Sequence, residues 1–375
     1  MNIAYYIHSL AVGGAESVVT NYLIQLQGKN HVILIVNYLD GNSFLAKKLQ
    51  DRGVKIYSLL QGPNVIVFKG IDKIFNTKLD CSRKFDKILK TEKIDVLHIH
   101  TSIDLIRTSR FDKTRTVITF HSEVKRYFDI IGSKNLEYMR NFAQSGASFI
   151  AINYKMKDDI TSLFDTNKVN YIPNGIDFEN IRKLCGFREV NRKALGFNSS
   201  TFVIGNVSRF NRVKNHEKLI NIFSELYKRN SDSVLVMVGG DDDNRQEIIR
   251  KMAVKNGIDN CIRMPGAVEN PWKYMSAFDV MVIPSFSESF SLVAIEAQSM
   301  GIPCICSEAV PDEVLVNDNC CKLTLNEPLN IWVDAIVNSK ITTNRKAVQR
   351  FSISNIIAEH EHLYKGLIQG NKTKI

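Results

Sequence analysis

Two carboxylates flank a junction at which an apolar strand gives way to a helix. The apolar run 280–284 predicts a buried strand, and the run 292–300 predicts the helix that follows it. Glu288 lies in the polar loop between them, and Glu296 lies eight residues further along, in the helix. Because backbone N–H groups at a helix N-terminus lack intrahelical acceptors and attract anions, the junction predicts a nucleotide-sugar site with a carboxylate near each set of hydroxyls. The N–H groups that would hold the diphosphate belong to Ser289, Phe290, Ser291 and Leu292.

A second strand–helix junction carries cations directly in front of a helix N-terminus, a position that is unfavourable for positive charge. The predicted strand 202–207 is followed by Arg209, Arg212 and Lys214, and then by a predicted helix over 217–228. Cations at a helix N-terminus oppose the helix dipole, so an anionic ligand explains them better than helix stability does. The guanidinium of Arg209 could grip two phosphate oxygens, and Lys214 offers a point charge.

The first predicted strand also leads into a turn of the phosphate-binding type. Gly13 and Gly14 precede a predicted helix over 17–27. Glycines at such a turn let a ligand approach the backbone closely, although a purely structural role is an equally simple interpretation. The dinucleotide fingerprint G-x-G-x-x-G is absent, which disfavours a dehydrogenase.

Apolar strands alternate with helix-length segments along the chain, which predicts an α/β fold with parallel sheets covered on both faces. The strands are expected at 3–8, 32–37, 54–58, 96–100, 116–120 and 149–152, and then at 202–207, 234–238, 261–264, 280–284 and 302–306. Pro173, Asn174 and Gly175 are strong breakers between the two series. We therefore expect an acceptor-binding domain over 1–177, a nucleotide-sugar-binding domain over 178–350, and a C-terminal helix within 351–375 that packs back on the first domain.

Length and composition agree with two folded domains. The chain has 375 residues, 44% hydrophobic and 23% charged, and it exceeds the size at which one core usually stops growing. It starts with strand-like residues instead of a signal peptide, and it lacks an apolar run of about 20 residues. The seven cysteines do not suggest a disulfide framework, and Cys304 and Cys306 are expected to be core residues.

The net charge of +10 is densest between residues 69 and 140. The region includes Lys84, Lys87, Lys90, Lys93, Arg107, Arg110, Lys113, Arg115, Lys125 and Arg126. Such a face can be merely solvated or can contact anionic lipid. No nucleic-acid-binding motif accompanies the charge, so a nucleic-acid partner is not expected.

Two further groups of residues have alternative interpretations. The acidic run 241–243 could hold a metal ion, but acids in front of a predicted helix over 244–256 are also favourable caps, and we expect no metal. His98 and His100 point the same way on one predicted strand, but a third metal ligand is not evident. We expect these histidines at the rim of the sheet or in an acceptor cleft.

The residues singled out above resemble the donor half of family-four glycosyltransferases, which are retaining enzymes of the GT-B fold. The resemblance rests on Arg209, Lys214, Gly266, Tyr274, Asp279, Pro284, Ser285, Glu288, Glu296, Ala297, Gly301, Ile302 and Pro303, and it extends to Gly13, Gly14, His121 and the stretch 173–175. It thus covers nearly the whole chain. The stretch 296–304 and the residues after it resemble the subgroup that builds bacterial capsules and exopolysaccharides.

The resemblance implies a role for each of these residues. Arg209 and Lys214 would hold the donor diphosphate, Glu296 would bind the ribose, and Glu288 and His121 would contact the transferred sugar. The acceptor would attack from the side on which the nucleotide leaves, so neither a protein nucleophile nor a cofactor is expected. Many relatives have glycine where this chain has Ser289 and Ser291, which leaves donor preference open.

The sequence therefore predicts a retaining glycosyltransferase of cell-surface polysaccharide biosynthesis, with a UDP-sugar as the expected donor. The expected acceptor is a glycan or a polyprenyl-diphosphate-linked oligosaccharide. We expect the protein in the cytoplasm, peripherally bound to the inner membrane surface. Two alternatives are an epimerase of similar fold, which would consume the donor without an acceptor, and a noncatalytic nucleotide-sugar-binding subunit of a transferase complex.

Overall fold

The computed structural model divides into two compact units, which are described separately. It describes residues 1–11, 13–39, 43–60, 75–101, 103, 105, 107–242, 244–342 and 346–370. The first unit comprises Met1–Gly175 and Ile353–Ile375, and the second comprises Ile176–Ser352. The divisions therefore lie two residues from the expected ones, and the first directly follows the breaker stretch 173–175.

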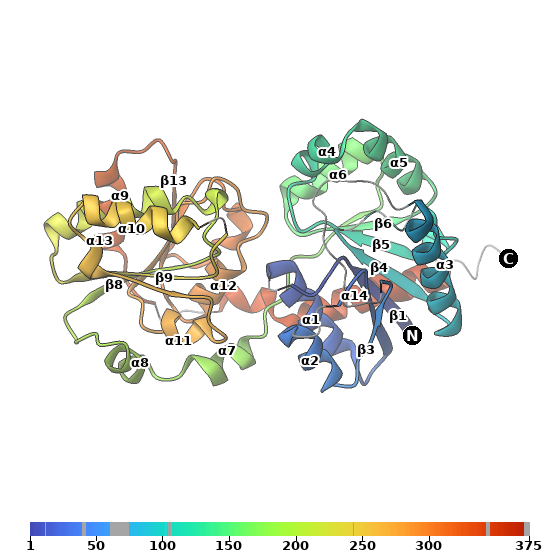
Figure 1. The fold of residues 1–375 in the computed structure, drawn as a ribbon, viewed down its shortest axis with the longest axis horizontal. Helices are drawn as coiled ribbons and strands as arrows, with labels where there is room; N and C mark the ends of the chain where they lie inside the picture. The colour runs from blue at the N-terminus through green and yellow to red at the C-terminus, as the bar shows by residue number, and fades with distance from the viewer. Residues whose placement is uncertain are drawn as a thin grey trace. The chain divides into compact units, whose positions relative to one another are not determined.

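The first unit is built on a parallel sheet of seven strands in the order β3-β2-β1-β4-β5-β6-β7 (Figure 1). The strands are β1 (Asn2–Ile7), β2 (His31–Val36), β3 (Lys55–Ser58), β4 (Val96–His100), β5 (Thr116–Thr119), β6 (Ser148–Ala151) and β7 (Val169–Tyr171). The sequence predicted all but β7. That strand has only three residues, with a polar Asn170 at its centre, so it lacks the apolar run that marks the others.

Helices cover both faces of this sheet. They are α1 (Gly14–Leu26), α2 (Phe44–Gln50), α3 (Phe75–Thr91), α4 (Val124–Ile131), α5 (Ser133–Gln144), α6 (Tyr154–Phe164) and α14 (Ile353–Gly370), with a short 3-10 turn η1 (Lys113–Arg115). The C-terminal helix α14 packs against α1 and β4. Its buried side chains are Ile353, Ile356, Ile357, His360 and Tyr364. Among the helices that the structure describes, none is long and apolar enough to cross a bilayer.

The second unit contains a parallel sheet of six strands in the order β10-β9-β8-β11-β12-β13. The strands are β8 (Phe202–Val207), β9 (Ser233–Val238), β10 (Ile262–Gly266), β11 (Val280–Ile283), β12 (Cys304–Ser307) and β13 (Cys321–Leu323). The helices are α7 (Phe178–Cys185), α8 (Arg188–Ala194), α9 (His216–Arg229), α10 (Arg245–Lys255), α11 (Pro271–Met275), α12 (Leu292–Ser299) and α13 (Leu329–Asn338). Short 3-10 turns are η2 (Arg212–Lys214), η3 (Asp259–Cys261), η4 (Asp312–Val314) and η5 (Ala347–Phe351). The sequence did not predict β13, whose three residues are only half-buried.

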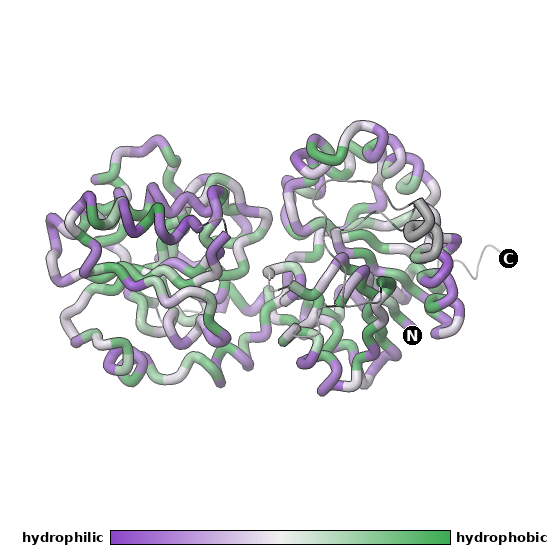
Figure 2. Tube along the Cα trace, viewed as in Figure 1, coloured by the Kyte–Doolittle hydropathy of each residue, from purple (hydrophilic) through white to green (hydrophobic). Residues whose placement is uncertain are grey.

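The hydrophobic core of each unit is built around its apolar strands. Figure 2 shows the hydrophobic residues gathered along the strands of each unit. In the second unit, side chains of the strands meet those of α9 and α13, including the fully buried Trp332. Gly205 in β8 lies so close to Phe278 that a Cβ atom would be 1.9 Å from the ring. Cys304 and Cys306 are buried in β12, as expected for core residues, and all seven cysteines are free.

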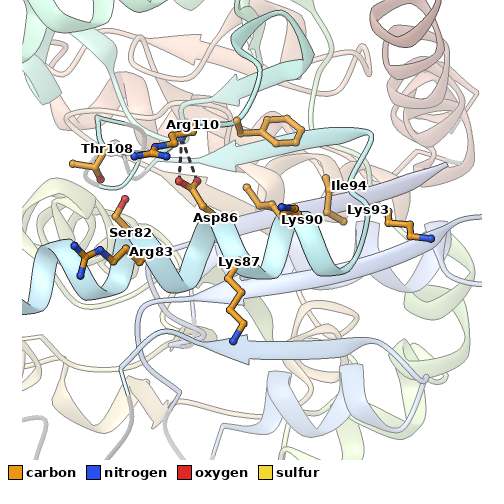
Figure 3. Close-up of a pocket in the computed structure, with 11 residues that line it drawn as sticks. Ser82, Arg83, Asp86, Lys87, Lys90, Lys93, Ile94, Thr108 and Arg110 are labelled. Carbon is orange, nitrogen blue, oxygen red and sulfur yellow. Dashed lines mark hydrogen bonds between the residues drawn. The ribbon is translucent and has the colours of Figure 1, made fainter.

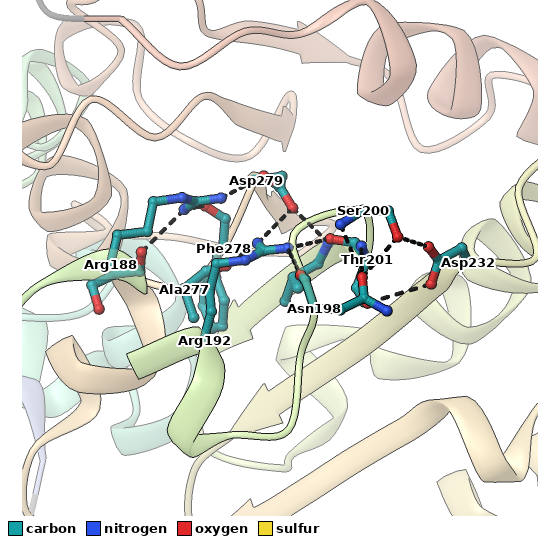
Figure 4. A network of polar contacts seen from close by, with 11 residues as sticks. Arg188, Arg192, Asn198, Ser200, Thr201, Asp232, Ala277, Phe278 and Asp279 are labelled. Atoms are coloured by element: carbon teal, nitrogen blue, oxygen red, sulfur yellow. Dashed lines mark hydrogen bonds and ion pairs between the residues drawn. The ribbon is translucent and has the colours of Figure 1, made fainter. Parts of the chain in front are cut away.

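A partly buried ion-pair network fixes α8 to the start of the central strands (Figure 4). Asp279 accepts from Arg188 and, at 3.1 Å, from Arg192, and it also accepts from the backbone N–H of Val203 at 2.7 Å. Arg192 is 7% exposed and donates to backbone oxygens of Ala277 and Thr201 as well. Because both cations are hydrogen-bonded to one carboxylate, Asp279 has a structural position at the start of β11, away from the strand ends that carry the site.

Candidate active site

The strand order places a ligand site at one point in the second sheet. In parallel α/β sheets, ligands bind beyond the carboxyl ends of the strands, where the strand order reverses. Here the order reverses between the neighbours β8 and β11, whose residues Ile204 and Val280 pair directly. The two junctions that the sequence singled out follow these two strands. The fold therefore brings Lys214 and Glu288 together from positions 74 residues apart.

The central feature of the site is the Glu288 carboxylate, which is held by two donors. Lys214 Nζ donates to Glu288 Oε1 at 2.8 Å, and Ser285 Oγ donates to the same oxygen at 2.7 Å. The Glu288 side chain is 7% exposed and that of Lys214 is 25% exposed. Among the described residues, no donor contacts Glu288 Oε2. One carboxylate oxygen is thus fixed by the protein, and the other remains available to a ligand.

Backbone and side-chain contacts hold the loops that carry these residues. Asn215, in the left-handed conformation at φ +53°, begins α9 and donates from Nδ2 to Pro284 O at 3.0 Å. Phe286 N donates to Val213 O at 2.8 Å. From the other side, Ser307 Oγ in β12 donates to Ser285 O at 2.6 Å. The loop after β11 is therefore anchored to both of its neighbours, which makes the position of Glu288 rigid.

Arg209 lies at the same edge of the sheet with its charge largely open to solvent. Its side chain is 61% exposed and forms a 3.7 Å ion pair with Asp242. Asp241 instead accepts from Gln246 N in the first turn of α10, at 3.2 Å, so it acts as the helix cap that the sequence allowed. The remaining acid of the run, at position 243, lies outside the described residues.

Helix α12 begins one residue after an unusual turn. Ser291 has φ +62°, in the left-handed region that favours glycine, and its buried Oγ has no hydrogen-bond partner among the described residues. Leu292 starts the helix, and Ala294 N donates to Ser291 O at 3.1 Å, so the N–H groups of Leu292 and Val293 are those without an intrahelical acceptor. The side chain of Phe290 is 3% exposed and packs edge-on against Phe351. The side chain is apolar core, and only the backbone at 290 remains available as a donor.

Glu296 lies in the first turns of the same helix and is partly buried. Burial raises the pKa of its carboxyl to about 7, and the nearby Trp272 indole opposes that rise. The carboxyl therefore changes protonation near neutral pH, where it can either accept or donate a hydrogen bond to a hydroxyl.

In the first unit, Gly13 and Gly14 lie at the junction of β1 and α1. Gly13 caps the helix, and Gly14 is its first residue. A Cβ atom at Gly13 would lie 2.3 Å from Glu16 Oε2, but this atom is the end of a flexible side chain that can move aside, so the contact does not require glycine. Its φ of −162° is extended and needs no glycine.

His121 follows β5 and forms a hydrogen-bonded pair with His100 at the end of β4. His100 Nδ1 and His121 Nε2 are 2.8 Å apart. Burial lowers the pKa of His121 to about 4 and that of His100 well below its usual range. The expectation that His98 and His100 lie at a rim or in a cleft is wrong, because both are buried, at 0% and 1% exposure.

The reason for that error is a hydrogen-bond network inside the first unit. His98 is bonded through Nδ1 to Tyr364 Oη at 2.6 Å and through Nε2 to Thr119 Oγ1 at 2.8 Å. Tyr364 belongs to α14, from the far end of the chain, so the sequence near β4 gives no signal of it.

The sequence also indicated no role for Ser285, although Pro284-Ser285 was one of the motifs that carried the resemblance. Only the folded geometry brings this hydroxyl to Glu288.

Two glycosyltransferase family models match the chain. Residues 12–180 match the family described as Glycosyltransferase Family 4, and residues 187–330 match Glycosyl transferases group 1. The chain is 31% identical to the glycosyltransferase EpsF of Bacillus subtilis over 48% of its own length and 46% of that protein. It thus aligns with about half of EpsF. It is 27% identical, over 75% of its length and 78% of the other, to the Escherichia coli UDP-Gal:alpha-D-GlcNAc-diphosphoundecaprenol alpha-1,3-galactosyltransferase.

The fold is shared with a solved structure. HepE of Anabaena, in complex with UDP-glucose, superimposes with a TM-score of 0.74 at 18% identity, covering 96% of this chain and 99% of that one. The seven- and six-stranded parallel sheets described above are the two Rossmann-like domains of the GT-B fold. The chain belongs to the family-four glycosyltransferases of the GT-B fold, and exopolysaccharide-type enzymes are among its relatives.

Proposed function

We propose that the protein is a retaining, metal-independent glycosyltransferase that moves a sugar from a nucleotide-diphospho-sugar to a glycan or lipid-linked acceptor. The observation that carries the proposal is the meeting of Lys214, Glu288 and Ser285 beyond the ends of β8 and β11, in front of the N-terminus of α12. This arrangement offers cations and N–H groups for a diphosphate beside a carboxylate oxygen that can accept from sugar hydroxyls.

Each part of the proposed reaction has a residue suited to it. Lys214 and Arg209 neutralise the charge that grows on the departing diphosphate, which is the electrostatic task that usually contributes most to catalysis. Glu288 Oε2 accepts from a hydroxyl of the transferred sugar, and Glu296 binds the ribose hydroxyls. The bond between the anomeric carbon and the diphosphate oxygen breaks while the acceptor oxygen bonds to that carbon from the same side. The departing phosphate oxygen takes the acceptor's proton.

A UDP-sugar and a polyprenyl-diphosphate-linked acceptor are the substrates that the comparisons favour. The HepE structure is a complex with UDP-glucose, and the E. coli relative is named for a UDP-galactose donor and a diphosphoundecaprenol acceptor. Together with the likeness to EpsF, these relatives support a role in cell-surface polysaccharide biosynthesis.

Release of free nucleotide from a panel of UDP- and GDP-sugars tests the proposal. The assay is run with and without a lipid-linked acceptor extract, in the presence of a metal chelator. Acceptor-dependent release from one donor is expected. Conversion of the donor without any acceptor would indicate the epimerase instead, and donor binding without turnover would indicate a noncatalytic subunit. Inactivity that added divalent ions restore would contradict metal independence.

The basic region of the first unit supports a second part of the proposal, peripheral binding to the cytoplasmic face of the membrane. A pocket of about 930 Å³ lies between α3 and the segment before β5 (Figure 3). Its cationic lining residues are Arg83, Lys87, Lys90, Lys93 and Arg110. Asp86, the acid among them, is already engaged by Ser109 Oγ at 2.7 Å and by Arg110 N at 3.2 Å. The five cationic residues outnumber this single carboxylate, so the lining has an excess of positive charge that anionic lipid headgroups would offset.

Charge reversal of the exposed lysines Lys87, Lys90 and Lys93 to glutamate is expected to abolish sedimentation with anionic vesicles. Each basic residue near an anionic surface contributes about 1 kcal/mol. Lys84 is left unchanged, because its Nζ donates to Ser58 O at 2.7 Å and to Leu59 O at 3.1 Å and thus supports the fold. Reversal of Lys251, which is exposed in the second unit, is the control. Equal vesicle binding by the triple variant and the wild type would contradict the membrane proposal.

A further inference from the structure

The surroundings of His100 Nε2 show which nitrogen of each ring in the His100–His121 pair carries the proton. A hydrogen bond between the two imidazoles needs one proton between His100 Nδ1 and His121 Nε2, which are 2.8 Å apart. Burial lowers the pKa of both rings, so at neutral pH each ring carries a single proton. Two arrangements remain. Either His100 donates from Nδ1, or His121 donates from Nε2.

The second arrangement would leave a buried donor without an acceptor. If His121 donated, the proton of His100 would have to sit on Nε2. That atom is buried and has no hydrogen-bond partner among the described residues. A buried N–H without an acceptor is rarer and less favourable than a buried nitrogen that lacks a donor. His100 therefore carries its proton on Nδ1 and donates it, and His121 Nε2 accepts.

The packing around His100 holds the ring in the orientation that makes this bond. The His100 ring stacks on Tyr5, with centroids 5.0 Å apart, and lies nearly parallel to the His121 ring, with 15° between the two planes. On a further side it contacts the ring of His98 at 4.1 Å. His98 is itself fixed at both nitrogens by Tyr364 and Thr119. Contacts from His121 to His100, from His100 to His98 and from His98 to Tyr364 therefore connect His121 to α14.

We propose that His100 is a positioning residue that holds neutral His121 in the tautomer protonated on Nδ1. His121 then presents an N–H donor at Nδ1, where none of the described residues supplies a hydrogen-bond partner. The ligand class that suits this atom is an acceptor oxygen, such as a sugar hydroxyl. This last assignment rests on the proposed function, whereas the tautomer itself does not.

Nuclear magnetic resonance of protein with 15N-labelled histidine tests the tautomer directly. The resonances of His121 are identified by their loss in His121→Asn. At neutral pH the wild type is expected to show a protonated Nδ1 and an unprotonated Nε2 at His121. A protonated Nε2 would overturn the proposal, whatever the activity of the enzyme.

Two substitutions of His100 provide a matched pair. In His100→Asn the side-chain amide can replace Nδ1–H as the donor to His121, whereas in His100→Gln the amide reaches the position of Nε2. The asparagine variant is expected to keep the Nδ1-protonated tautomer, and the glutamine variant is expected to lose it. In the transfer assay, kcat of His100→Gln should fall by about tenfold or more, as for one misdirected hydrogen bond, with the affinity for free UDP unchanged. The same tautomer in both variants would contradict the role of His100. A wild type with the expected tautomer but without transfer would contradict the proposed function alone.

Discussion

Replacement of Lys214 or Glu288 by alanine is expected to lower sugar transfer by about a thousandfold, as for loss of a group that stabilises charge in a reacting site. Lys214 supplies the cation nearest to Glu288, and its removal leaves the departing diphosphate with the more exposed Arg209. Removal of Glu288 takes away the oxygen that is free for the sugar and leaves Lys214 and Ser285 without their shared acceptor. The rate of nucleotide release at saturating donor measures the effect.

The two variants should differ in how they bind the donor. Lys214→Ala is expected to weaken the binding of free UDP, because it removes a phosphate contact. Glu288→Ala should leave UDP affinity unchanged and weaken binding of the UDP-sugar only. Titration calorimetry with both ligands separates these outcomes.

A second lysine–glutamate pair in the same unit provides the control. Lys228 and Glu225 are 2.9 Å apart on an exposed face of α9, with Lys228 70% exposed. Lys228→Ala should leave transfer and stability nearly unchanged, since exposed pairs contribute little. Wild-type rates in a well-folded Lys214→Ala or Glu288→Ala would place the chemistry elsewhere on the molecule.

The sequence predicted those site residues that directly follow an apolar strand, because such a strand can be recognised from a short stretch of sequence. The apolar runs that became β8 and β11 are unambiguous, because strands buried on both faces are nearly continuous in hydrophobic residues. Each is followed at once by its functional loop. Once the sheet is parallel, the residues Lys214 and Glu288 must meet at one edge, so no knowledge of side-chain geometry is needed to pair them.

The part that the sequence missed depends on contacts between distant segments. His98 and His100 alternate with apolar residues on β4, a pattern that equally fits a rim and a buried network. The deciding partner, Tyr364, lies 266 residues from His98. The short segments β7 and β13 are strands because they pair with the neighbouring strands β6 and β12, and their own composition does not indicate a strand.

The same histidine network makes the first unit sensitive to acid. Burial lowers the pKa of His98 and His100 well below 6.5, that of His121 to about 4 and that of His360 to about 3. In the unfolded chain each histidine binds a proton near pH 6.5, so between that pH and the folded pKa the unfolded state holds more protons. Stability is therefore complete above about pH 6.5 and is lost as the pH falls, by about 1.4 kcal/mol per pH unit for each histidine.

The second unit is expected to be less sensitive to acid, because protonation of His216 and protonation of Glu296 change its stability in opposite directions. The pKa of His216 is lowered to about 3, so this residue also costs stability as the pH falls below 6.5. Glu296, with its pKa raised to about 7, is protonated first in the folded state, so acid stabilises the fold down to the unfolded pKa near 4.5. The first unit should therefore unfold before the second at about pH 5.5.

The distribution of tryptophan allows the two units to be followed separately. Both tryptophans of the chain, Trp272 and Trp332, lie in the second unit, so their fluorescence reports on that unit while far-ultraviolet circular dichroism reports on both. In urea titrations at about pH 7.5 the two signals should change close together, whereas at about pH 5.5 the circular dichroism should begin to fall at lower urea than the fluorescence does.

Two histidines on α14 test the cause of this separation. His360 is 2% exposed, while His362 lies two residues away on the exposed side of the same helix. His360→Gln should lower stability at neutral pH but reduce the dependence of stability on pH, because one titrating group is lost. His362→Gln should change neither quantity, because its side chain lies on the exposed side of the helix, outside the buried network. If both variants kept the wild-type pH dependence, protonation of buried histidine could not be the force that unfolds the first unit in acid.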